Sequence, residues 1–247
     1  MKKLLLQSAL LAAGFLLLAG CTNVATFDYS AAAEPMVSFA GPPEAKSIAV
    51  LPFLDQRSRK SLQQLMPAAD SGSFYLGLIP LMPYGYVKKP YPENSDDFVS
   101  LGRFHFDPVR ELAAASALSL KASNLFSRVE QANSPEEAGT DYIWQGTVTN
   151  TYYSGALLTY CVTYFASPAL WALGAPEGVS RNALGVEFAL IERKTGDVVW
   201  RYRFDGEDFL IHWIYARVGK DVSLYPVLMR QAMNGALVNL HASMPAL

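Results

Sequence analysis

The sequence has 247 residues, of which 51% are hydrophobic and 17% are charged, and its net charge is −2. This balance can bury a sizeable core and is unlike that of a disordered stalk. A weakly acidic chain also argues against nucleic acid or an anionic lipid surface as an electrostatic partner.

The first twenty residues have the parts of a secretory signal peptide. Lys2 and Lys3 precede a mostly apolar run from Leu4 to Leu18, and small residues follow. The apolar run is too short for a comfortable membrane span. We therefore expect residues 1–20 to be removed and the mature protein to leave the cytoplasm. Removal leaves 18 basic against 22 acidic residues, a net charge of −4.

The junction Leu18-Ala19-Gly20-Cys21 resembles the lipobox of bacterial lipoproteins. The resemblance implies that Cys21 is acylated, with palmitate-type chains, and becomes the first residue of the mature chain. Thr22 is not the aspartate associated with inner-membrane retention, so the resemblance implies the periplasmic face of the outer membrane. The alternative is a plain secreted protein with a chance cysteine, which the agreement of charge, apolar run and lipobox disfavours.

Residues 21–46 are rich in small residues, are interrupted by prolines and have no sustained period, which predicts a flexible tether. The folded part is expected over residues 47–247 as a single domain. It opens with an apolar β-rich run from Ser47 to Phe53, which predicts a buried strand, followed by a polar loop over residues 55–60.

Residues 67–100 combine glycines and prolines with aromatic residues, which predicts an unusually long loop. The aromatic residues are Phe74, Tyr75, Tyr84, Tyr86 and Tyr91. Three interpretations stay open for this loop: contact with a partner, packing over the domain's own core, or disorder.

Regular elements are predicted again after residue 106. Asp107-Pro108 with Glu111 indicates the start of a helix that runs to about Ser127. A strand follows over residues 142–152, and then a hairpin over residues 183–204 with its turn at residues 194–197, where Gly196 supplies a positive φ. A last helix is expected over residues 223–241, with apolar stripes on two sides.

An apolar insertion over residues 152–177 contains a stretch without any charge, from Ser154 to Ala175. Gly155, Pro168 and Gly174 divide it into short pieces, which disfavours a membrane span. It is either a buried helical hairpin or an exposed arm that contacts the membrane interface or a neighbouring subunit. The candidate contact residues are Leu158, Tyr160, Tyr164, Leu170 and Trp171.

The residues that could carry chemistry are sparse. His105, His212 and His241 are distant in sequence and have no metal-ligand spacing, and no nucleophile elbow or phosphate-binding loop is present. The acidic groups at residues 96–97, 136–137 and 205–208 are assigned to turn solvation. We expect no enzymatic activity, no cofactor and no metal. Cys161 is expected to be a buried, reduced thiol, with an intermolecular disulfide or a reactive thiol as alternatives.

The element order over residues 47–243 and the run Ile48-Ala49-Val50-Leu51-Pro52-Phe53 with Asp55 resemble the group formed by the TolB amino-terminal domain, LpoB and CsgG-type lipoproteins. The resemblance implies a single α/β (α+β) domain, in which a mixed, mostly antiparallel sheet is packed by two main helices and carries an inserted apolar helical segment. The aromatic loop and the insertion depart from that pattern, so no site residue is carried over.

Two functions stay open. One is a non-catalytic structural, assembly or secretion-accessory role in the cell envelope, as a homo-oligomer or with an envelope protein partner. The other is a binding module that activates or regulates a periplasmic enzyme.

Overall fold

The computed structural model describes residues 24–25, 27–30, 35–57, 86–89, 103–104, 106–157, 172–176, 178–213 and 224–244. The fold class is confirmed as a single α/β domain with a mixed, mostly antiparallel sheet and two main helices. The strands are β1 (Val24–Ala25), β2 (Glu44–Val50), β3 (Leu54–Asp55), β4 (Tyr86–Lys89), β5 (Arg103–Phe104), β6 (Phe126–Gln131), β7 (Tyr142–Asn150), β8 (Tyr153–Leu157), β9 (Gly178–Glu192) and β10 (Val198–His212). The helices are α3 (Pro108–Ser123) and α5 (Leu224–Ser243).

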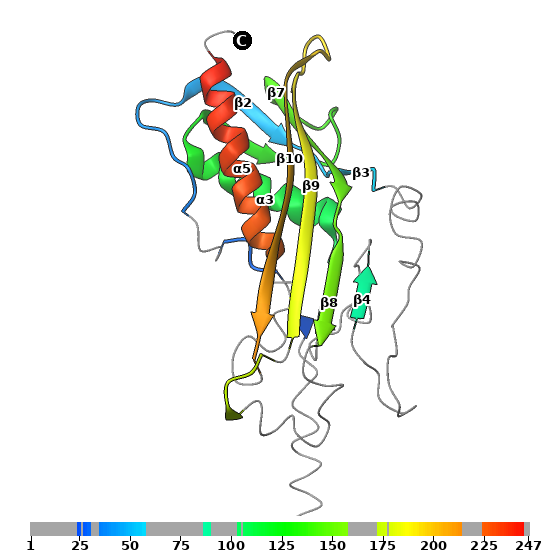
Figure 1. Cartoon of the computed structure of the whole chain (residues 1–247). Helices are drawn as coiled ribbons and strands as arrows, with labels where there is room; N and C mark the ends of the chain where they lie inside the picture. The colour runs from blue at the N-terminus through cyan, green and yellow to red at the C-terminus, as the bar shows by residue number, and fades with distance from the viewer. Residues whose placement is uncertain are drawn as a thin grey trace, which may run out of the picture.

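The long hairpin of β9 and β10 forms one side of the sheet, and β10 is an edge strand among the described residues (Figure 1). One side of β9 pairs with β10 along its whole length, and the other side pairs with β7 and then with β8. Strand β2 adds to β7 in parallel, and β6 adds to β2 in parallel. A separate two-stranded pairing joins β1 to β5.

The core lies between one face of the sheet and the two helices. Trp144, Phe188 and Leu190 point to this face and are fully or almost fully buried, and the Trp144 ring stacks on Trp200 at 5.5 Å. Helix α5 buries one predicted stripe, Met229, Met233, Leu237 and Leu240, against them. In the other predicted stripe, Leu224 and Leu228 are buried while Val238 is 52% exposed. Both predicted stripes therefore contribute buried residues, and the second is exposed at Val238 near the C-terminal end of the helix.

The start of helix α3 is as predicted. Asp107 caps it by accepting a hydrogen bond from the backbone N–H of Arg110 at 3.2 Å, and Pro108 is its first residue. The Glu111 carboxylate also accepts from the backbone N–H of Asp107 at 3.0 Å. These contacts satisfy donors that a helix N-terminus otherwise leaves free.

The end of helix α3 differs from the prediction. The helix stops at Ser123, because Asn124 takes a left-handed conformation with φ of 58°, and β6 follows at Phe126. The prediction missed β6 because most of its residues are at least partly exposed, which leaves no clear apolar alternation.

Strand pairing also extends further than predicted. The hairpin strands run over residues 178–192 and 198–212, so the acidic residues 205–208 lie within β10 and not in a turn. The start of the uncharged segment is strand β8, which pairs with β9 and β4. The predicted turn is confirmed, with Gly196 at φ of 77°.

Gly146 of β7 allows Phe53 to pack directly against the sheet. A Cβ at this position would lie 2.3 Å from the Phe53 ring, and Phe53 is only 3% exposed. We predict that Gly146→Ala lowers the free energy of unfolding by about 1 to 3 kcal/mol, because the buried ring must move. Urea unfolding measures this change. Gly139→Ala is the matched control, since no atom lies within 4 Å of its added Cβ, and an equal loss in both variants would contradict the packing argument.

Candidate functional site

The residues predicted to mediate anchoring and contact lie outside the described residues. These are Cys21, Leu158, Tyr160, Tyr164, Leu170 and Trp171, together with Cys161. Their roles therefore stay predictions. Of the three histidines, His105 lies outside the described residues, and His241 lies against the Phe39 ring at 4.1 Å.

Two acidic residues of β10 form ion pairs with neighbouring arginines. Asp205 and Glu207 point to the face of the sheet opposite the helices and pair with Arg203 and Arg181, respectively. Among the residues that the structure describes, no three His, Cys, Asp or Glu side chains are grouped so that they could hold a metal ion. Within the same residues, no helix is long and apolar enough to cross a bilayer.

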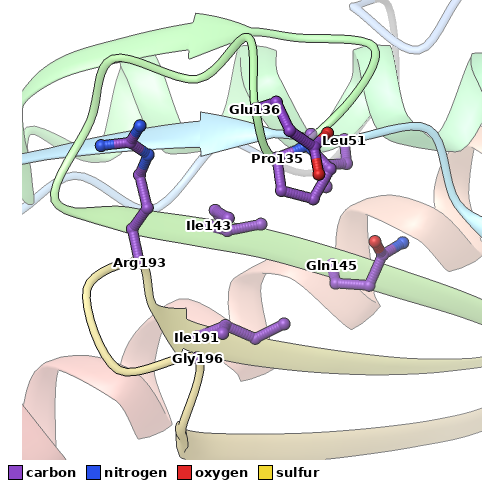
Figure 2. A pocket seen from close by; sticks show the side chains of 8 residues that line it. All are labelled: Leu51, Pro135, Glu136, Ile143, Gln145, Ile191, Arg193 and Gly196. Atoms are coloured by element: carbon purple, nitrogen blue, oxygen red, sulfur yellow. The ribbon is translucent and has the colours of Figure 1, made fainter.

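A pocket of ≈ 520 Å³ lies on the face of the sheet opposite the helices, beside the β9–β10 turn (Figure 2). Its floor is apolar, and Leu51 and Ile143 are each only 5% exposed. The lining residues are Leu51, Pro135, Glu136, Ile143, Gln145, Ile191, Arg193 and Gly196. Strands β7 and β9 and the loop after β6 position them.

The polar side chains of the pocket differ in how they are held. The Gln145 amide donates to the carbonyl oxygens of Pro52 and Gly146 at 3.0 and 2.9 Å, which fixes its orientation. A hydrogen bond from Ser134, together with one from its own backbone N–H, lowers the pKa of the Glu136 carboxyl. Figure 2 shows Arg193 and Glu136 on either side of Ile143.

The described lining of the pocket combines an apolar floor with a few polar side chains. That lining holds no serine, cysteine, histidine or lysine, and Glu136 is its only acid, so no nucleophile is paired with a base. The apolar floor can take an aliphatic or aromatic group, while Arg193 and Gln145 can contact a neighbouring polar group. Sequence reasoning missed this pocket because its residues come from four separate segments.

A second feature is the docking of the N-terminal segment onto the domain. The buried Arg230 of α5 donates to the carbonyl oxygen of Tyr29 at 2.7 Å, and the Tyr29 hydroxyl donates to Glu111 at 3.3 Å. The Phe27 ring lies against Phe106 at 5.1 Å and Tyr225 at 5.9 Å. Residues 27–30 are thereby held at the N-terminal ends of both helices.

Contacts continue along the same segment after residue 34. Asn234 of α5 donates to the Pro35 carbonyl at 3.0 Å and accepts from the Val37 N–H at 3.2 Å. The backbone N–H of Phe39 donates to the Ser123 carbonyl at 2.9 Å. The described part of the expected tether thus lies on the domain, because Phe27, Tyr29 and Phe39 provide aromatic surface that a flexible linker lacks.

This docking brings the predicted anchor close to the domain. Strand β1 begins at Val24, three residues after Cys21. Three residues span at most about 10 Å even when fully extended. Phe27 and Tyr29 before the first proline, and Phe39 between the prolines, were the sequence signal that could have indicated this contact.

Comparison with known proteins leaves the family open. The sequence matches no family model and no curated protein. Among solved structures, protein XCC0632 of Xanthomonas campestris, of the family DUF330, is 10% identical with a TM-score of 0.40, and the match covers 88% of this chain and 92% of that one.

Two further solved structures are similarly distant. PelC of Paraburkholderia phytofirmans, a dodecamer, is 13% identical with a TM-score of 0.37 over 81% of this chain and 92% of that one. A neuraminyllactose-binding hemagglutinin homologue of Helicobacter pylori is 10% identical with a TM-score of 0.38, over 89% and 91% of the two chains. At these scores we draw neither family nor function from them.

Burial and the neighbouring Glu111 carboxylate raise the pKa of Tyr29 well above its ordinary value. The folded state therefore holds this proton more tightly than the unfolded state, whose tyrosine pKa is about 10. We predict that the free energy of unfolding falls as the pH rises above about 10, and that Tyr29→Phe makes the fall shallower by up to about 1.4 kcal/mol per pH unit.

Urea unfolding at a series of pH values from neutral to strongly alkaline measures this slope. Burial also raises the pKa of Tyr225, so Tyr225→Phe should reduce the same slope. An identical slope in the parent and in Tyr29→Phe would contradict the burial of the Tyr29 hydroxyl.

Proposed function

We propose that this chain is a lipid-anchored lipoprotein of the bacterial cell envelope with a non-catalytic structural or assembly role. The observation that carries the proposal is the junction Leu18-Ala19-Gly20-Cys21 behind a charged start and a short apolar run. Several acyl chains on one cysteine hold a protein at a membrane, because each buried CH₂ contributes about 0.8 kcal/mol. Thr22 favours the periplasmic face of the outer membrane.

The docked N-terminal segment supports this proposal. Arg230, Tyr29 and Glu111 connect the residues after Cys21 to both helices of the domain. A chain that is pulled at Cys21 therefore transmits the load into the core and not into a loose linker. Such an arrangement suits a protein that holds a fixed position at a membrane.

The anchor is tested by removing its thiol. Cys21→Ser should block acylation and lipoprotein-type processing, since the thiol is the acylated group. We expect an uncleaved precursor or a mislocalised protein, detected by intact mass and by membrane fractionation. Cys161→Ser is the matched control and should stay processed and in the membrane fraction. An unchanged mature mass and unchanged fractionation of Cys21→Ser would contradict the proposal.

The second candidate function is a binding module that regulates an envelope enzyme or another envelope protein. The pocket beside the β9–β10 turn favours it, because an apolar floor with a few polar groups is typical of ligand and peptide sites. In Figure 1 this turn lies at the end of the sheet away from β1. The pocket is thus accessible to a partner while the other end is held.

A photo-reactive benzoylphenylalanine in place of Gln145 tests the binding module in intact cells. We expect one discrete crosslinked partner, because the group would stand at the pocket floor. The control places the same group at Leu118, which is 45% exposed on α3. Equal crosslinking from both positions, or none from either, would argue against a partner at this pocket.

A further inference from the structure

The most exposed large apolar side chains of the described residues gather at one end of the domain. Leu173 is 84% exposed and Phe209 is 59% exposed. Phe209 lies near the end of β10, and Trp213 follows that strand and donates its indole N–H to the Gly174 carbonyl at 3.2 Å. This hydrogen bond holds the segment that carries Leu173 beside the end of β10.

The N-terminal segment reaches the same end. Phe27 contacts Tyr225, whose hydroxyl donates to the carbonyl of Thr151 at 2.9 Å, directly before β8. Strand β8 then runs to Leu157, which pairs with Gly178 at the start of β9. In the view of Figure 1, β1 (dark blue) is drawn at the same end of the sheet as the last residues of β8 and the start of β9.

Contact with water alone does not account for these exposed apolar side chains. A solvated domain end gains nothing from a leucine and a phenylalanine that are both mostly exposed, because apolar area in water is unfavourable. Tryptophan, by contrast, is enriched where protein meets the interface of a bilayer, since its ring is apolar and its N–H is polar. Leu173, Phe209 and Trp213 together have the composition of an interfacial contact.

Electrostatic attraction does not favour contact between this end of the domain and an anionic lipid surface. Phe209 is opposite Arg181, and the Arg181 guanidinium already pairs with Glu207 at 3.5 Å. The mature chain also carries a net negative charge once residues 1–20 are removed. Apolar insertion must therefore supply the contact, and salt should affect it little.

We propose that this end of the domain, defined by Leu173, Phe209 and Trp213, lies directly on the lipid bilayer. The inference rests on the proposed acylation of Cys21, which brings the bilayer within three residues of β1. The occupant of this surface is lipid and not a second copy of the chain, because the anchor places lipid at this end. The pocket beside Gly196 then faces away from the membrane.

Fluorescent labels on single cysteines test the proposal in the full lipidated chain. Leu173→Cys and Phe209→Cys, each in a Cys161→Ala background, are labelled with a nitrobenzoxadiazole dye and reconstituted into phosphatidylcholine vesicles. Two matched controls carry the dye elsewhere. Val198→Cys lies at the other end of the same strand and is 41% exposed, and Leu118→Cys lies on α3.

Quenching distinguishes a label in lipid from a label in water. We expect spin-labelled phosphatidylcholine to quench the dye at positions 173 and 209 several-fold more than at 198 and 118, and aqueous iodide to give the reverse order. Raising the salt concentration should leave this pattern unchanged. Equal quenching of all four positions by iodide in vesicle-bound protein would overturn the proposal.

Vesicle flotation separates this failure from a failure of the proposed function. If the unlabelled chain does not float with the vesicles, the lipid anchor itself is wrong. If it floats but the labels at 173 and 209 stay in water, only the contact surface is wrong. Should the label at Phe209 lower the thermal stability, Leu173 carries the test alone, because its side chain makes little contact with the domain.

Discussion

A buried arginine holds the N-terminal segment to the domain, and the rest of the architecture depends on it. Arg230 is 5% exposed and donates to the Tyr29 carbonyl, so its charge is compensated by hydrogen bonding inside the protein. Glu111 completes the arrangement by accepting from the Tyr29 hydroxyl and from the backbone N–H of Asp107, the residue that caps α3. One small network thus joins the N-terminal segment to α3 and α5.

Short sequence motifs predicted the elements that a few adjacent residues are enough to define. The Asp107 cap, the Gly196 turn and the apolar strand at residue 48 depend on a few adjacent residues, and the structure confirms each. Strand β6, the docked N-terminal segment and the pocket depend on pairing between distant segments, which no window of the sequence contains. The acidic group at residues 205–208 was misassigned for the same reason, because its pairing with β9 outweighs its turn-like composition.

The two ends of the sheet have different surfaces. One end carries exposed Leu173 and Phe209, and the other carries a pocket with an apolar floor and Arg193 at its side. The long β9–β10 hairpin is paired along its length and connects them. On the proposed anchoring, one end meets lipid and the other is presented to partners in the periplasm.

The claim that the N-terminal segment is docked on the domain is tested most directly by the height of the domain above the bilayer. A free tether of residues 22–46 would let the domain stand off by about 25 to 30 Å on average. Neutron reflectometry of the lipidated chain on a supported bilayer measures the water layer between the headgroups and the protein. The docked N-terminal segment predicts protein density in contact with the headgroups, and a water layer of the tether's thickness would contradict it.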